Sequence, residues 1–315
     1  MPPQTQIIMN TICSVNAYSD GTDALYNEIF SRLSAIEAVF SATISTSELS
    51  EINRRAGEES VVASDEMLYV LNVALEIARL TEGAFNPALN PLISLWGINT
   101  DDARVPTDDE ISSILPLLDF NDIIIDEKTV FLSKRGMSLN LGGIVKGYAA
   151  DCIVEILGAH NVKKAVVDLG GNIYVYGEKD EGGVMDKKKA NGEKWIVGVK
   201  NPFDENLPPI VRLNVFESSI VTSGAYQRFF EKDGVRYHHI LDGKTGFPAA
   251  SGLVSATVIA PLSIVADGLS TAAFVLGEEK SLALENEFED CFEIPIDFVF
   301  IRSDKSVFIS DGLKP

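Results

Sequence analysis

Residues 139–151 read LNLGGIVKGYAAD and combine a short apolar run, two glycines and a helix-forming segment. The pattern predicts a short strand that enters a turn at Gly142 and Gly143 and then opens a helix over 145–157. Such a helix N-terminus directs free N–H groups and the positive end of its dipole toward an anion, and Lys146 adds a full charge in the first turn. The glycine spacing fits neither the G-x-G-x-x-G dinucleotide motif nor a Walker loop. An anion site and a plain packing turn are both open at this point.

The residues before 120 have helical periodicity. Apolar side chains recur every three or four residues over 24–40 and 64–81, which predicts two amphipathic helices. Two further helices are predicted from the capping-box spacing, in which a hydroxyl residue precedes a glutamate by three positions: Ser45 with Glu48, and Thr107 with Glu110. The first third of the chain is therefore helix-rich.

The residues after 120 are rich in short β-branched runs, interrupted by helical segments near 145–157 and 262–276. The predicted strands are 123–125, 166–167, 195–199, 211–215 and 253–259, in addition to a first strand over 7–15. The Asp233-Gly234 pair predicts a two-residue hairpin turn. These patterns predict an α+β fold, with one compact mixed domain over 1–315 and mostly antiparallel strands after the helix-rich third. Residues 178–194 are charged and glycine-rich and are expected to form a surface loop.

The charge balance limits the possible partners. The 315 residues include 26 Lys and Arg against 46 Asp and Glu, so the formal net charge is −20. Such a surface repels phosphates, and we expect no nucleic acid partner. An anionic small ligand would need a local lysine, helix N-termini or a divalent cation to offset the field.

The cysteines and apolar runs indicate an ordinary folded protein. Cys13, Cys152 and Cys291 are far apart and form no Cys-x-x-Cys pair, so we expect buried thiols rather than disulfides or a structural zinc site. No run of 18 apolar residues occurs, which predicts no membrane span in this chain. The start at Met1 lacks the pattern of a signal peptide, although a chain trimmed of its leader would look the same.

Two glycine-containing loops are candidates for ligand binding. Residues 83–87, Gly-Ala-Phe-Asn-Pro, follow a predicted helix end and form a stiff loop with free N–H groups that can hold a planar or phosphorylated ligand. Residues 168–172, Asp-Leu-Gly-Gly-Asn, form a second corner of this kind. Helix termination and tight backbone packing are the alternative explanations.

Two of the three histidines in the chain are adjacent, at His238 and His239, on a strand predicted after the hairpin. Because side chains alternate across a strand, the two rings face opposite ways and do not readily share one metal ion. We expect one ring to point inward. A neutral histidine near a carboxylate can serve as a general base or orient a nucleophile at pH 7. A structural histidine pair is the alternative.

Asp267 and Thr271 predict a metal site. They are four residues apart on the helix predicted over 262–276, so a carboxylate and a hydroxyl share one face. This all-oxygen pair suits Mg²⁺ rather than zinc. The apolar neighbours would make an unpartnered Asp267 costly to bury, which favours a metal over local helix capping.

Taken in order, these segments resemble the FAD:protein FMN transferases, the ApbE-like flavin transferase family. The similarity runs from about residue 40 to about residue 277 and is carried by residues 83–87, 141–149, 222–226, 239–242, 245–246 and 266–271. The resemblance implies an ApbE-like, T-fold-like architecture and the transfer of FMN from FAD onto a Thr or Ser hydroxyl of a partner flavoprotein, with release of AMP. It also implies Mg²⁺ as cofactor, FAD as substrate, and an acceptor that is a subunit of an electron-transfer complex.

The resemblance assigns roles to individual residues. Mg²⁺ would be bound by Asp267, Thr271 and the backbone carbonyl of Gly143. Asp267 and His239 would be catalytic, with His239 helping to deprotonate the attacking hydroxyl. The FAD site would be lined by Thr43, Ala84, Phe85, Asn86, Asn140, Lys146, His239 and Ile240.

Some positions depart from the family pattern. Asn86 and Asn140 stand where the family often has aspartate, and Thr43 or Ile44 stands where an aromatic residue often stacks on the flavin. Within the family, weak stacking goes with a hydrolytic variant that splits FAD into FMN and AMP. An FAD pyrophosphatase and an FAD-binding protein without catalysis are therefore the alternatives to a transferase. Many members also begin with a lipoprotein leader, and none is visible in this sequence. The resemblance implies an extracytoplasmic location in the cell envelope, and a cytoplasmic location is the alternative.

Overall fold

The computed structural model describes residues 2–98, 100–177 and 194–313. The helices in these ranges are α1 Asp23–Phe40, α2 Glu48–Arg54, α3 Asp65–Leu80, α4 Asn90–Trp96, α5 Asp108–Ile114, α6 Val145–Ala159, α7 Ser263–Leu276, α8 Glu278–Ala283 and α9 Glu285–Phe292. The strands are β1 Gln4–Ile8, β2 Thr11–Asn16, β3 Val61–Val62, β4 Ile123–Asp126, β5 Thr129–Leu132, β6 Lys164–Leu169, β7 Asn172–Gly177, β8 Trp195–Val199, β9 Val211–Val215, β10 Ser218–Gly224, β11 Phe229–Lys232, β12 Val235–His238, β13 Leu253–Ala260, β14 Asp297–Arg302 and β15 Val307–Ile309. The expected surface loop at 178–194 lies outside the described residues except for Lys194.

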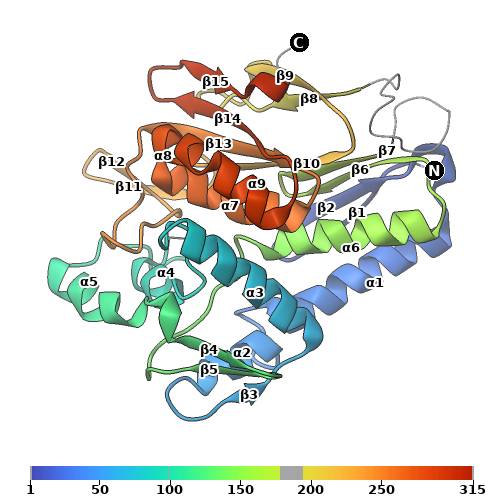
Figure 1. Ribbon diagram of the computed structural model, residues 1–315. Coiled ribbons are helices and arrows are strands. Elements are labelled where there is room, and N and C mark those ends of the chain that lie inside the picture. The colour runs from blue at the N-terminus through green and yellow to red at the C-terminus, as the bar shows by residue number, and fades with distance from the viewer. Residues whose placement is uncertain (1, 99, 178–193, 314–315) are drawn as a thin grey trace.

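A large antiparallel sheet is the frame of the molecule (Figure 1). Its described strands follow the order β1-β2-β6-β7-β10-β13-β14-β15, and every neighbouring pair is antiparallel. Helices α1, α6 and α7 cover one face, and the β8–β9 ribbon covers the other. Alternation along β14 shows both layers, because Phe298 and Phe300 join the core under the helices while Val299 and Ile301 join the core under the ribbon. The prediction of a mixed helix and sheet fold with mostly antiparallel strands is confirmed.

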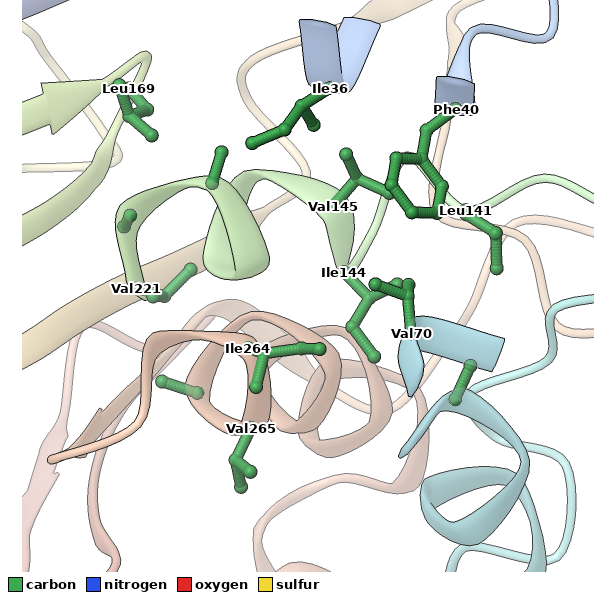
Figure 2. Packing of buried hydrophobic residues seen from close by; sticks show 14 of the residues in the cluster. Ile36, Phe40, Val70, Leu141, Ile144, Val145, Leu169, Val221, Ile264 and Val265 are labelled. Carbon is green, nitrogen blue, oxygen red and sulfur yellow. The ribbon is translucent and has the colours of Figure 1, made fainter. Parts of the chain in front are cut away.

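Helix α7 is buried on almost every side. It packs against α6, β10 and β13, and its buried residues include polar ones such as Ser263 and Ser270. Helices α6 and α7 touch at Gly147, where an added Cβ would lie only 2.3 Å from the carbonyl oxygen of Ser263. Figure 2 shows the apolar side chains around this crossing, with Val145 beside the ring of Phe40. A glycine at the contact therefore allows the two backbones to approach closely.

The helices expected over 24–40, 64–81, 145–157 and 262–276 are confirmed, as are the Thr107–Glu110 capping box and the hairpin at Asp233-Gly234. Of the described helices, none is both long and apolar enough to cross a bilayer.

The expected first strand is wrong in its extent. Residues 7–15 belong to two strands, β1 and β2, joined at Met9 and Asn10, each with a φ of 55°. Asparagine tolerates this left-handed conformation better than most residues do. The turn lacks the glycine that usually marks such a reversal, so the apolar pattern runs through it without a break.

Two other expected boundaries also differ. Helix α2 is capped by Ser47, whose Oγ accepts a hydrogen bond from the Ser50 N–H at 3.0 Å, and not by Ser45. Residues 139–141 are not a strand in the described structure. The side chain of Asn53 instead bonds the N–H of Leu139 at 2.6 Å and its carbonyl at 3.0 Å, so an amide takes the place of a strand partner.

We expect Gly147→Ala to destabilise the protein by about 1–3 kcal/mol or more, because a methyl group at this position overpacks the α6–α7 crossing. The control is Gly158→Ala on the same helix, where the new Cβ would meet only Tyr176 Oη at 3.6 Å and helix propensity favours alanine by about 1 kcal/mol. Urea denaturation of both variants measures the difference. A Gly147→Ala midpoint equal to or above that of wild type would contradict the prediction.

Candidate active site

Asp267 is buried where α7 meets the start of α6, with 5% of its side chain exposed. The N–H of Gly147 donates a hydrogen bond to its Oδ2 at 2.9 Å, and Lys146 Nζ lies 3.7 Å from its Oδ1. A free helix N–H and a lysine charge together offset the desolvation of this carboxylate. The N-terminus of α6 therefore binds a carboxylate of the chain itself, Asp267, and the binding of an external anion at the glycine turn stays a prediction.

Three segments that are distant in sequence meet at Gly143. The position that a Cβ would take on Gly143 is 3.4 Å from Thr271 Oγ1 on α7 and 3.4 Å from Phe85 Cε2 in the 83–87 loop. Thr271 Oγ1 is also 3.3 Å from Ser223 Oγ on β10. The structure thus brings together the glycine turn, the 83–87 loop and α7, which the sequence treated as separate candidates.

The predicted metal donors have the chemistry that Mg²⁺ prefers. The predicted donors are the Asp267 carboxylate, the Thr271 hydroxyl and the Gly143 carbonyl, all of them hard oxygen ligands. Within the described ranges there is no group of three or more His, Cys, Asp or Glu that could hold a metal ion, so a site built from such side chains is not present there. The ammonium of Lys146, 3.0 Å from the Gly142 carbonyl and beside Asp267, shows that this edge accommodates a cation. Metal binding itself stays a prediction.

Asn86 and Asn140 use both ends of their amides within the fold. Asn86 Nδ2 donates to the Leu118 carbonyl at 2.8 Å, and its Oδ1 accepts from the backbone N–H two residues further on, also at 2.8 Å. Asn140 Oδ1 accepts from the Gly142 N–H at 3.0 Å, and its Nδ2 donates to Asn90 Oδ1 at 3.3 Å. An aspartate at either position would lose the donated bond. A direct contact of these residues with FAD stays a prediction.

The other predicted FAD residues differ in exposure. Ala84, Phe85 and Ile240 are buried, and their contact with FAD stays a prediction. Thr43 is exposed in the loop between α1 and α2, and its Oγ1 lies 3.0 Å from Ser41 Oγ. Among the described residues, no hydrogen bond of Thr43 reaches another predicted site residue.

The adjacent histidines differ as expected, although only His238 belongs to the strand. His238 is buried at the end of β12, with Nε2 3.2 Å from the Ala249 carbonyl and its ring edge-on to Phe274, so it has a packing role. His239 follows the strand, and its Nδ1 is 3.2 Å from the Arg228 carbonyl oxygen. Because a carbonyl only accepts, Nδ1 carries the proton in this bond, and Nε2 is the nitrogen that can take up a proton.

Burial lowers the pKa of His239 to about 4. The positive charges of Arg228 and Lys146 act in the same direction, and the bond to the Arg228 carbonyl opposes them. Burial also lowers the pKa of His238. His239 is therefore neutral at pH 7, which is the state that a general base requires.

Two serines within the matched segments have structural roles that the sequence analysis missed. Ser223 Oγ on β10 lies 2.9 Å from Ser270 Oγ on α7, and Ser270 Oγ donates to the Asp267 carbonyl at 2.9 Å. These bonds hold the helix turn between Asp267 and Thr271 against the sheet. The sequence signal that could have found them is that each is a small hydroxyl residue within a matched segment, one on β10 and one on α7.

The comparisons with known proteins establish the family of this chain. A sequence model of the ApbE family matches residues 9–294. The chain is 41% identical to the FAD:protein FMN transferase of Treponema pallidum, over 98% of this chain and 87% of that protein, and 34% identical to one from Klebsiella pneumoniae, over 96% and 90%. The crystal structure of the ApbE protein from Thermotoga maritima has a TM-score of 0.85 and 29% identity, over 98% and 97%. The chain belongs to the ApbE family, and the predicted membership is confirmed.

The lowered pKa of His239 predicts a pH-dependent stability. The folded state keeps the imidazole neutral down to about pH 4, whereas the unfolded chain protonates it near pH 6.5. Between these values the unfolded state binds more protons, so the contribution of this group is present above pH 6.5 and is lost as the pH falls toward 4. In His239→Gln the free energy of unfolding should fall less steeply with acidification over this range. Urea titrations at several pH values measure the slope, and equal slopes for the two proteins would contradict the assignment.

Proposed function

We propose that this chain transfers the FMN part of FAD to a Thr or Ser hydroxyl of an acceptor flavoprotein and releases AMP, with Mg²⁺ as the required metal. The observation that carries the proposal is the junction of α6 and α7, where oxygen donors for a cation lie beside Lys146, a group for an anion. Phosphoryl-group transfer needs this combination. The relatives named above carry the name of this activity.

Each residue has a separate task in this reaction. Mg²⁺ held by Asp267, Thr271 and the Gly143 carbonyl would neutralise the charge that develops on the FAD pyrophosphate. Lys146 would bind a pyrophosphate oxygen with its ammonium group, and Phe85 would form part of the wall that orients FAD. The neutral Nε2 of His239 would accept the proton of the attacking hydroxyl.

The proposed step balances without a further reactant. A bond forms between the acceptor oxygen and the phosphorus atom attached to the flavin side, and the bond from that phosphorus to the bridging oxygen breaks. AMP leaves with the bridging oxygen, and the hydroxyl proton passes to His239 Nε2.

The proposal is tested by incubating the protein with FAD and Mg²⁺, with and without a Thr-containing acceptor domain, and resolving AMP, FMN and protein-bound flavin by chromatography. We expect AMP and flavin attached to the acceptor. Asp267→Asn keeps an oxygen for the Gly147 N–H but loses the charge, and we expect it to reduce turnover by about 100-fold or more, equivalent to about 2.7 kcal/mol or more of lost transition-state stabilisation. Equal amounts of AMP and free FMN in both tubes would contradict a transferase, and intact bound FAD would contradict any turnover.

An FAD pyrophosphatase is the second candidate, favoured by Thr43. This residue is exposed and bonded to Ser41, and it offers no ring to stack on the flavin. We expect Thr43→Tyr to raise the ratio of acceptor-bound to free FMN by about 2–10-fold, because an aromatic contact contributes about 0.5–1.5 kcal/mol. Thr43→Val, which removes the hydroxyl without adding a ring, is the matched control. The same ratio in Tyr, Val and wild-type proteins would remove the argument from Thr43.

We also propose that the acceptor is a subunit of an electron-transfer complex and that the chain acts on the extracytoplasmic side of the cell envelope. Both proposals rest on the family resemblance. Mass spectrometry of FMN-modified Thr and Ser peptides identifies the acceptor, and cell fractionation tests the location, where recovery in the cytoplasm alone would contradict it.

A further inference from the structure

The N-terminus of α7 is capped by a residue of another helix. Its own N-cap residue, Leu262, offers no side-chain acceptor. The carboxylate of Asp151 on α6 accepts instead from two backbone donors, the Ser263 N–H at 2.7 Å and the Ile264 N–H at 2.8 Å, one at each oxygen. A carboxylate at this position satisfies two free N–H groups and interacts favourably with the helix dipole. Asp151 therefore fixes the start of the helix that carries both predicted metal-binding side chains.

A second cap joins the same helices in the opposite direction. Gly147 is the third residue of α6, so its N–H has no acceptor within its own helix. It donates to Asp267 Oδ2 on α7 at 2.9 Å. Asp151 lies four residues after Gly147, and Asp267 lies four residues after Ser263. Each helix thus supplies a carboxylate that caps the N-terminus of the other helix. In both helices this carboxylate lies one turn after a residue that donates its own N–H to the partner helix.

The two caps leave little freedom for α7 to slide. The helices already touch at Gly147, where a Cβ would lie 2.3 Å from the Ser263 carbonyl oxygen. Ser263 Oγ also donates to Asn172 Oδ1 on β7 at 2.9 Å and lies 2.7 Å from Ser219 Oγ on β10. The start of α7 is therefore fixed to α6 by Asp151 and to the sheet by its own hydroxyl.

Burial opposes the charged form of Asp151. Burial raises the pKa of Asp151 to about 7, and the charges of Glu155 and Asp267 act in the same direction. The two backbone N–H donors oppose this effect. A neutral cap such as serine or asparagine would offer one acceptor oxygen, whereas the two oxygens of Asp151 accept one N–H each.

We propose that Asp151 is a positioning residue, which holds α7 against α6 and thereby sets the spacing between Asp267 and Thr271 on one helix and Gly143 and Lys146 at the start of the other. It acts through the helices and does not itself contact substrate. The inference rests on the proposed function only for the identity of the metal.

The test compares two pairs of variants of the whole chain. Asp151→Asn keeps the shape but has one acceptor oxygen in place of two, and Asp151→Glu keeps the carboxylate on a longer stem. Ser263→Pro removes one of the two donated N–H groups at the first helical position, where proline is tolerated. Ser263→Ala loses the same hydroxyl but keeps the N–H, so it is the matched control for the proline variant.

Two measurements are made on each protein. Hydrogen exchange of the Gly147 amide, followed by NMR without metal, reports whether Asp267 is still in place, because Asp267 Oδ2 is the acceptor of this N–H. Mn²⁺ binding, followed by EPR, reports the metal site without FAD or turnover. Leu213→Ala, a core substitution on strand β9 of the β8–β9 ribbon, controls for a general loss of stability.

We expect Asp151→Asn to speed exchange at Gly147 by about tenfold or more and to weaken Mn²⁺ binding by about 10–100-fold. Asp151→Glu should restore part of the Gly147 protection and part of the Mn²⁺ affinity. Ser263→Pro should speed exchange and weaken Mn²⁺ binding more than Ser263→Ala does. Leu213→Ala should lower only the melting temperature. Wild-type exchange at Gly147 in folded Asp151→Asn would overturn the inference. If that variant does not fold, equal exchange in the Pro and Ala variants would overturn it. A wild-type protein that binds no Mn²⁺ would contradict the metal in the proposed function, while the exchange data still decide the role of Asp151.

Discussion

The contact between α6 and α7 at Gly147 is the constraint on which the site depends. Only a residue without a side chain allows the two backbones to approach this closely, and only at this separation does the Gly147 N–H reach Asp267. The same approach places Lys146 beside that carboxylate and Thr271 beside Gly143. The absence of a side chain at Gly147 thus determines whether the buried carboxylate of Asp267 has a hydrogen-bond partner.

The junction also changes what the charge of the protein implies. With a formal net charge of −20, the chain repels an anionic ligand unless a local positive field exists. The N-terminus of α6 supplies part of that field, but its Gly147 N–H is already used by Asp267. The helix therefore stabilises an ionised carboxylate, and this carboxylate attracts a cation. The positive field for the FAD pyrophosphate would then come from the metal and Lys146 together, rather than from the glycine turn alone.

Local sequence patterns predicted the helices that carry the site. They could not predict hydrogen bonds between residues that are distant in sequence. The glycine turn at 142–143 predicted the start of α6, and the apolar segment 262–276 predicted α7. The replacement of a strand at Leu139 by Asn53 depends on a residue 86 positions away, and the cap on α7 depends on Asp151, 112 positions before Ser263. Periodicity contains no information about such partners. Which segments meet at Gly143 was expected only from the family resemblance, since neither spacing nor composition brings the 83–87 loop to α7.

The hydrogen bonds of Asn86 and Asn140 change what these two asparagines imply about catalysis. By the family resemblance they stand where carboxylates are often found, which allowed a binding protein without catalysis as an alternative. In the structure each amide nitrogen donates to an oxygen, of Leu118 in one case and of Asn90 in the other, and a carboxylate would face these oxygens with no proton to offer. The amides thus belong to local networks that fit them. The proposed metal donors on α7 and at Gly143 do not involve either residue, so the two substitutions are no argument against turnover. The remaining argument for a different outcome is Thr43, and it concerns which nucleophile attacks, not whether the pyrophosphate is cleaved.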